Sequence, residues 1–318
     1  MLFNEINAKS SAAIDLDRIL EKAKIPTLPV VAQKLLELCK DERAAFSDFA
    51  QLIGSDPGLA SRILRVANSA YYGLRNKATT LERAITALGL KQVKTVALGF
   101  HLAASLNEFE AKGFDMGDFW QQSVFRAVLG RHLAKRYCPV YCEEAFLVGL
   151  LQDCGVLLLA QAFGADYVRM WEENHCSLDS LYRLEQEVFQ ADHLKAAERL
   201  AQKWDLPAIL SYPLSRHHHQ PQDQPDGDPM IQVSQIAYFV GTLSLHNPEA
   251  VSENDVRLPD FCERVFGLSP QDMKQMLREA KEEFLGISKL FTGILPDQVN
   301  AAHLLAQANS LLSRLASY

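Results

Sequence analysis

Residues 53–73 read IGSDPGLASRILRVANSAYYG, and this stretch contains the start, the body and the end of one helix. Asp56 followed by Pro57 is typical of a helix N-cap with proline at the first helical position. Apolar side chains recur through the body of the helix. Asn68 and Ser69 predict its end, because their side chains can bond free backbone carbonyls or start a turn.

The segments on either side of this stretch also predict helices. Apolar residues recur at helical spacing in VVAQKLLELCKD, residues 30–41. Thr79 and Glu82 predict a capping box that opens a helix at LERAITAL, and Gly89 predicts the end of that helix. Another helix is expected over residues 91–104. The alternating β-branched pattern of strands is absent from the sequence, which therefore predicts an all-α fold.

The remainder of the chain continues the helical pattern. A charged helix is expected after the cap formed by Ser269 and Pro270. The prolines, glycine and acids of residues 217–230 exclude regular structure and predict a loop. We expect further helices over residues 119–137, 142–163, 165–173, 177–204, 231–245 and 299–316.

Composition limits the classes of function. The 318 residues are 48% apolar and 22% charged, which is ordinary for a soluble globular protein, and the net charge of −7 argues against nucleic acid as the main partner. The six cysteines are scattered, as in proteins with reduced thiols. No signal peptide is recognisable, and no stretch approaches the roughly 18 apolar residues of a membrane span. We therefore expect a cytoplasmic protein without a membrane partner.

One acid stands out in an apolar run. Residues 149–160 read GLLQDCGVLLLA, and Asp153 lies in the middle with Gln152 beside it. A buried carboxylate is costly unless it is paired, bound to a metal or protonated. The run therefore indicates a site, or what remains of one.

Three segments in register, IPTLPVVAQKLLEL, IGSDPGLASRILRVANSAYYG and TTLERAITALGLKQVKTVALG, give the chain a resemblance to the HDOD domain family of bacterial signalling proteins. The likeness covers about Ile25 to Gln220. It implies a multi-helix bundle in which an N-terminal helical subdomain packs on a degenerate HD-domain-like subdomain, with C-terminal helices added. We accordingly divide the chain into an extension (1–24), an HDOD domain (25–220) and a C-terminal helical region (221–318) that packs on the HDOD core.

The resemblance also implies a vestigial metal site. HDOD domains are relatives of HD phosphohydrolases, in which an early His, a His-Asp pair and a late Asp bind a metal that activates water. In this chain the early His corresponds to Gln122, the pair to Gln152 and Asp153, and the late Asp to Gln235. Three further positions where HD relatives often carry histidine are occupied by His193, His217 and His218.

Glutamine is a neutral and weak metal ligand, so the replaced positions predict no bound metal, no cofactor and no catalytic residue. We expect the three glutamines, Asp153 and a histidine to form a hydrogen-bonded polar cluster, because a carboxamide both donates and accepts. Asn68 and Tyr72 have two interpretations: a helix junction that determines the fold, or a contact to a partner or ligand.

The favoured function is a non-enzymatic signal-transduction module that binds a protein on a separate chain, with a small ligand in the old cleft as a variant of this hypothesis. One alternative is a residual metal-dependent phosphohydrolase that acts on a nucleotide or cyclic dinucleotide, with metal near Asp153, His193 and His217 or His218. A second alternative is a DNA-binding regulator, because LERAITALGLKQVKTVAL resembles a helix-turn-helix whose second helix would be Lys91 to Phe100.

Overall fold

The structure is a computed structural model that describes residues 25–41, 43–109, 112–174, 178–219, 228–243 and 262–315. Over these residues the chain forms helices joined by turns, with no strand beyond one isolated bridge between Thr292 and Leu295. This confirms the predicted all-α class. The predicted N-terminal extension, residues 1–24, lies outside the described residues.

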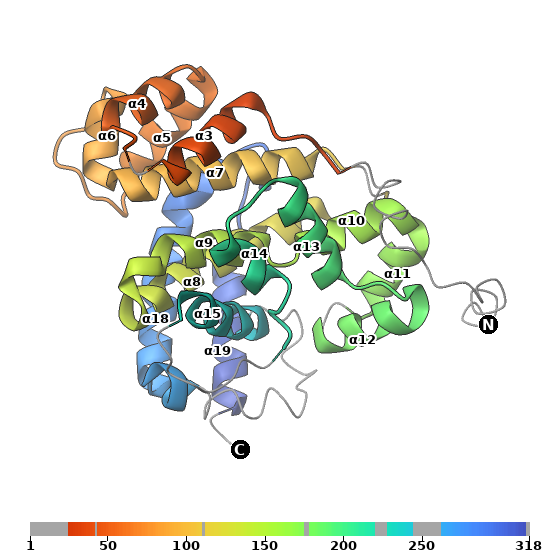
Figure 1. Cartoon of the computed structure of the whole chain (residues 1–318). Helices are drawn as coiled ribbons and strands as arrows, with labels where there is room; N and C mark the ends of the chain where they lie inside the picture. Colours follow the sequence, from red (N-terminus) through yellow and green to blue (C-terminus); the bar gives the residue numbers. More distant parts are fainter. Residues whose placement is uncertain are drawn as a thin grey trace.

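The N-terminal helices form a layer at one end of the molecule, above a long helix, α7 (Figure 1). Asp56 caps α5 as predicted, since its Oδ1 accepts a hydrogen bond from the backbone N–H of Leu59 at 2.9 Å. Thr80 caps α6, one residue after the predicted Thr79. The layer and its base are α3 (Val30–Lys40), α4 (Phe46–Gly54), α5 (Pro57–Ala67), α6 (Leu81–Leu88) and α7 (Leu90–Asn107).

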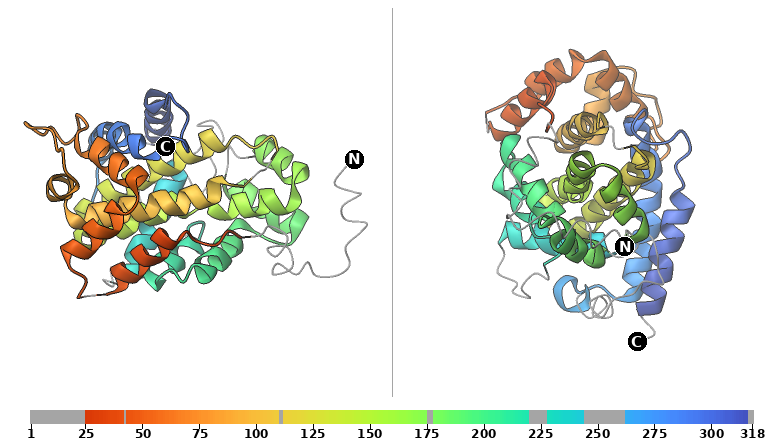
Figure 2. Two further views of the ribbon diagram at one scale, coloured as in Figure 1. Left: turned by 90° about the horizontal axis from the view of Figure 1, so that it is seen from above. Right: turned by 90° about the vertical axis from the view of Figure 1, so that its right-hand side faces the viewer.

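The centre of the molecule is an apolar pair of helices, α8 and α9, packed backbone to backbone. A Cβ placed on Gly149 of α9 would lie 2.8 Å from the carbonyl oxygen of Arg126 in α8, so only glycine allows this approach. The views in Figure 2 show the pair running through the core. The central elements are α8 (Met116–Tyr137), a short 3₁₀ turn (Pro139–Tyr141), α9 (Cys142–Leu151) and α10 (Cys154–Phe163).

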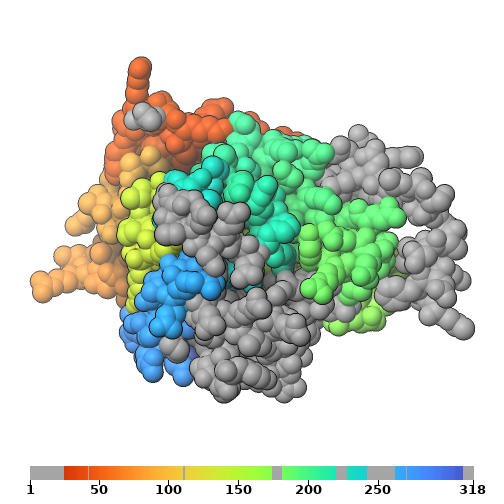
Figure 3. Space-filling view, turned by 60° about the horizontal axis from the view of Figure 1, so that its bottom comes forward, coloured from red at the N-terminus to blue at the C-terminus, as the bar shows by residue number. Residues whose placement is uncertain are grey.

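In the described part of the chain, α10 is followed by α11 to α15. Figure 3 shows α11 and α12, in green, at the end of the molecule opposite the N-terminal layer. The surface of α13 to α15 lies between that layer and α11 and α12. These helices are α11 (Ala165–Asn174), α12 (Leu178–Phe189), α13 (His193–Lys203), α14 (Ala208–Leu214) and α15 (Pro229–Leu243).

The C-terminal helices pack on the core, and buried charges join them to it. Arg131 of α8 is fully buried, and its guanidinium donates to Glu143 of α9 at 2.8 Å and to Glu283 of α18 at 2.7 Å. The Tyr71 hydroxyl, after α5, donates to the same Glu283 at 3.0 Å. The C-terminal elements are a π-helical turn (Cys262–Phe266), α18 (Pro270–Ile287), a 3₁₀ turn (Ser288–Phe291) and α19 (Ala301–Leu315).

Two helices that the sequence predicts as continuous are broken in the structure. The run 142–163 divides into α9 and α10 at Gln152 and Asp153, and the run 177–204 divides into α12 and α13. The second break falls at Gln190, with a φ of 52°, and Asp192, which caps α13. Both breaks carry residues of the candidate site to the ends of helices.

The expectation about membrane spans was wrong in one respect. Residues 139–163 are long enough and apolar enough to cross a membrane by composition alone. In the structure 83% of the apolar window is buried inside the protein, and Asp153 interrupts the run between α9 and α10. The apolar composition therefore matches a core helix pair.

Candidate functional site

Asp153 lies at the break between α9 and α10 and is 1% exposed. Its Oδ2 is 2.7 Å from Nη1 of Arg126, and its Oδ1 is 3.1 Å from Nε2 of His217. Burial by itself would raise the pKa of this carboxyl group. The charge of Arg126 is the largest of the opposing effects that outweigh burial and hold the pKa well below its usual range, so Asp153 is ionised.

His193 begins α13 and is held at the site by its backbone and by Glu185 of α12. A Cβ on Gly155 would lie 1.9 Å from the His193 carbonyl oxygen, so α10 and α13 touch through this glycine. Glu185 Oε2 accepts from the His193 backbone N–H at 2.9 Å and from Nδ1 at 2.6 Å. The Tyr167 hydroxyl donates to the other oxygen of Glu185. Burial lowers the pKa of His193, but Glu185 and Asp153 raise it above its usual value overall.

His217 lies in the turn after α14, and its Nδ1 is 3.0 Å from the carbonyl oxygen of Leu214. Because a carbonyl oxygen only accepts, Nδ1 must carry the proton. Burial lowers the pKa of His217, which favours the neutral ring. The Nε2 lone pair of the neutral ring then faces the ionised Oδ1 of Asp153, and neither atom has a hydrogen-bond partner.

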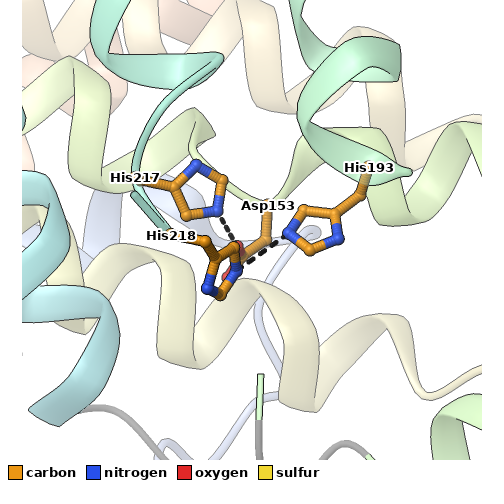
Figure 4. Close-up of side chains that lie close together, drawn as sticks. All are labelled: Asp153, His193, His217 and His218. Carbon is orange, nitrogen blue, oxygen red and sulfur yellow. Dashed lines mark hydrogen bonds and ion pairs between the residues drawn. The ribbon is translucent and has the colours of Figure 1, made fainter. Parts of the chain in front are cut away.

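His218 completes the group from the same turn. Its Nε2 is 3.0 Å from Nε2 of His193, and its ring stacks on Tyr182 of α12 with 5.7 Å between centroids. One ligand atom from each of Asp153, His193, His217 and His218 lies within 4.8 Å of the other three. Figure 4 shows the three rings turned toward the carboxylate. We call these four residues the Asp-His₃ cluster.

The Asp-His₃ cluster fits a divalent transition-metal ion. Three imidazole nitrogens and one carboxylate oxygen are ligands that zinc and similar ions accept. Two of the ligand atoms, Asp153 Oδ1 and His217 Nε2, are buried acceptors without a donor. Glu185 and the Leu214 carbonyl fix two rings through Nδ1, just as metal-bound histidine usually bonds a carboxylate or a carbonyl oxygen through its other ring nitrogen. A cation between these atoms would satisfy both acceptors.

The structure pairs Asp153 with Arg126, which the predicted cluster did not contain, and with His217. Gln122 donates to Asp118 at 3.1 Å, and Gln235 accepts from the Tyr137 hydroxyl at 2.7 Å. The carboxamide of Gln152 is buried without a hydrogen-bond partner.

Sequence reasoning missed Arg126 and Glu185. Arg126 is a charged residue inside the apolar helix FWQQSVFRAVLG, one turn after Gln122, and an isolated charge in such a run is a usable signal. Glu185 lies eight residues before His193 on a different helix, and no local pattern joins the two.

Asn68 and Tyr72 make contacts inside the fold. The Asn68 carboxamide donates to the Ala78 carbonyl at 2.9 Å and accepts from the Ala78 N–H at 2.7 Å, so it holds the loop after α5 closed. The hydroxyl of Tyr72 is hydrogen-bonded to the side chain of Gln92 on α7. These contacts support the interpretation of this motif as a helix junction.

The helix proposed for DNA binding is a core helix. Along α7, Val93, Val96 and Leu98 are buried. Lys91 is 3.4 Å from Glu144, and the Nζ of Lys94 is 3.5 Å from the centroid of a phenylalanine ring in α4. Most of the side chains that a recognition helix would present are thus packed inside, which argues against this alternative.

This chain is similar in sequence to a curated protein. An uncharacterized protein of Treponema pallidum (strain Nichols) is 22% identical over 236 residues, which are 72% of this chain and 45% of that protein. The chain thus spans less than half of the length of that relative.

Several solved structures share the fold. A candidate signal transduction protein from Marinobacter aquaeolei VT8 has a TM-score of 0.65 and 21% identity, over 91% of this chain and 64% of that chain. A candidate phosphohydrolase from Shewanella amazonensis SB2B has a TM-score of 0.65 and 22% identity, over 86% of this chain and 97% of that chain. The model of the HDOD domain matches residues 25–221, more than half of the sequence, and the chain therefore belongs to the HDOD domain family.

Proposed function

We propose that this chain is a regulatory module of a bacterial signal-transduction system, and that its Asp-His₃ cluster binds one divalent transition-metal ion. In this proposal the module acts by contact with a protein partner and does not hydrolyse a substrate. Membership of the HDOD family and the likeness to a candidate signal transduction protein support the regulatory part. The expectation of no metal, which rested on the glutamines, is revised.

The observation that carries the metal site is the pair of facing acceptors. Asp153 Oδ1 and His217 Nε2 lie 3.1 Å apart and fully buried, and neither has a donor. Two buried acceptors in contact repel each other and each loses its hydration, at a cost of about 1–3 kcal/mol per group. A protonated His217 would remove the conflict, but burial disfavours that state. A metal ion removes it and also gathers the Nε2 atoms of His193 and His218.

A closed site favours regulation over hydrolysis. Four protein ligands are the number that structural zinc sites use, whereas catalytic sites keep one position for water or substrate. The positions where HD phosphohydrolases carry their remaining ligands hold Gln122, Gln152 and Gln235. A metal-dependent phosphohydrolase stays the second candidate, because the Asp-His₃ cluster is intact and one relative of this fold is a candidate phosphohydrolase.

The test measures metal content and hydrolysis on the same preparation. Untagged full-length protein is titrated with Zn²⁺ and Mn²⁺, beside His218→Ala and the control His219→Ala, which alters the exposed neighbouring histidine. We expect one ion per chain in the wild type and in His219→Ala, and at least about tenfold weaker binding in His218→Ala. Hydrolysis of bis(p-nitrophenyl) phosphate with Mn²⁺ that disappears in Asp153→Ala would establish the phosphohydrolase instead.

A further inference from the structure

The two oxygens of Asp153 face different cations. Oδ1 points toward the histidine nitrogens, whereas Oδ2 is 2.7 Å from Nη1 of Arg126. The side chains of Asp153 and Arg126 are 1% and 4% exposed, so water does not screen the pair. Only Oδ1 is therefore free to bind an added ion.

Arg126 is fixed where it lies. Its Nη2 donates to the Ser123 hydroxyl at 3.0 Å, and its Nε is 3.5 Å from the carbonyl oxygen of Gly149. The same Gly149 brings α9 into contact with the backbone of Arg126, so the helix that ends two residues before Asp153 is held against the helix that carries the guanidinium. An arginine side chain keeps its charge in proteins, and this one cannot turn away without losing several buried hydrogen bonds.

We propose that Arg126 is an internal cation that occupies Oδ2 of Asp153. It thereby restricts the Asp-His₃ cluster to a single metal ion. It also weakens the binding of that ion enough to make the binding reversible. This inference rests on the proposed function. A carboxylate that bridges two metal ions through its two oxygens needs both of them, and here Arg126 occupies one. A fixed positive charge beside the ligand also repels an incoming divalent cation.

A second consequence concerns the protein without metal. In a structural zinc site the binding free energy of the metal is folding free energy, and removal of the ion unfolds the domain. Here Asp153 keeps Arg126 as its partner when the ion leaves, so its charge is not left uncompensated in the core. The metal-free chain should therefore stay folded, as an ion-responsive regulator requires.

The experiment compares full-length wild type, Arg126→Gln, Arg126→Lys and Asp153→Asn. Zn²⁺ affinity and stoichiometry are measured by calorimetry, Co²⁺ binding by visible absorption, and folding by circular dichroism with and without EDTA. We expect one ion in the wild type, at least about tenfold tighter binding in Arg126→Gln, affinity near wild type in Arg126→Lys, and no binding in Asp153→Asn. We also expect EDTA to leave the wild-type helical signal and its cooperative melting in place.

The outcomes separate this inference from the proposed function. If the wild type binds one ion and a folded Arg126→Gln binds it no more tightly, the role of Arg126 is overturned and the metal site stands. If only Arg126→Gln binds, the proposed function fails and Arg126 is the permanent cation of the site. If neither binds, both fail. Two Asp153-dependent ions in the wild type, or unfolding by EDTA, would overturn the role of Arg126 even where Arg126→Gln does not fold.

Discussion

At the scale of single residues, the site depends on how each histidine is oriented. His193 and His217 both present Nε2 to Asp153 because Nδ1 is bound elsewhere, to Glu185 in one case and to a backbone carbonyl in the other. The residues that orient the rings thus determine the site as much as the ligands do. None of these orienting contacts follows from the spacing of the histidines in the sequence.

Replacement of Glu185 by glutamine tests this orientation. The variant keeps the shape of the side chain but removes the negative charge that raises the pKa of His193. We expect Zn²⁺ affinity at pH 7 to fall about 10–100-fold, as for other partners of metal-bound histidine. The measurement is a calorimetric titration beside Glu187→Gln, a change at an exposed position of the same helix. Equal affinities in the two variants would show that Glu185 does not act on the site.

At the scale of helices, two breaks and two glycines build the site. The break at Gln152 and Asp153 ends α9, and Gly155 then lets the start of α13 approach α10. Local signals predicted the helices that have caps, such as Asp56 before α5 and Ser269 before α18. They missed the break at Asp153, because apolar residues on both sides favour one continuous helix. The partners that Asp153 meets at the break, Arg126 and His217, are distant in sequence.

Gly155→Ala tests the contact between α10 and α13. A methyl group there would meet the backbone carbonyl of His193, and the backbone would have to move. We expect a loss of about 1–3 kcal/mol in the free energy of unfolding, together with weaker metal binding. The matched control is Gly54→Ala, where the new Cβ would be 3.8 Å from Leu81, an ordinary contact. A Gly155→Ala variant as stable as the control would contradict this packing.

Asn68→Ala tests whether this residue serves the fold. Loss of both bonds to Ala78 leaves a buried donor and acceptor unpaired, which costs about 1–3 kcal/mol. Urea unfolding would measure this change, with the exposed Asn76→Ala in the same loop as the control. Unchanged stability in Asn68→Ala would favour the other interpretation, in which Asn68 contacts a partner or ligand.

At the scale of the whole molecule, buried charge joins the parts of the chain. Glu283 of α18 accepts hydrogen bonds from Arg131 and from Tyr71, and its Oε2 is 2.8 Å from Nε2 of His132. Glu283 lies beyond the residues that match the HDOD family model, yet it compensates an arginine inside them. The helical class was predictable from periodicity. This ion pair was not, because its partners are 152 residues apart.

Glu283→Gln tests this connection. Removal of one partner leaves the buried charge of Arg131 with Glu143 as its remaining carboxylate among the described residues. We expect a loss of about 3–5 kcal/mol in the free energy of unfolding at pH 7. The control Glu282→Gln changes an exposed neighbour and should stay within about 0.5 kcal/mol.

The pH dependence of the same pair of variants gives an independent check. Burial would raise the pKa of Glu283, but His132, Arg131 and Lys135 hold it well below its usual range. A carboxyl group with a lowered pKa in the folded state stabilises the protein fully above its unfolded pKa of about 4.3, and this stabilisation is lost as the pH falls further. We therefore expect Glu283→Gln to flatten the decline of stability below about pH 4. A decline as steep as in Glu282→Gln would contradict this assignment.

The central claim, that Asp153, His193, His217 and His218 bind one metal ion, is tested most directly by anomalous diffraction. Crystals of the full chain grown with Zn²⁺ would be measured on both sides of the zinc absorption edge. We predict a single strong anomalous peak among the carboxylate and the three imidazole rings, absent in Asp153→Asn. A wild-type map from crystals grown in saturating Zn²⁺ that has no peak among these four side chains would contradict the account.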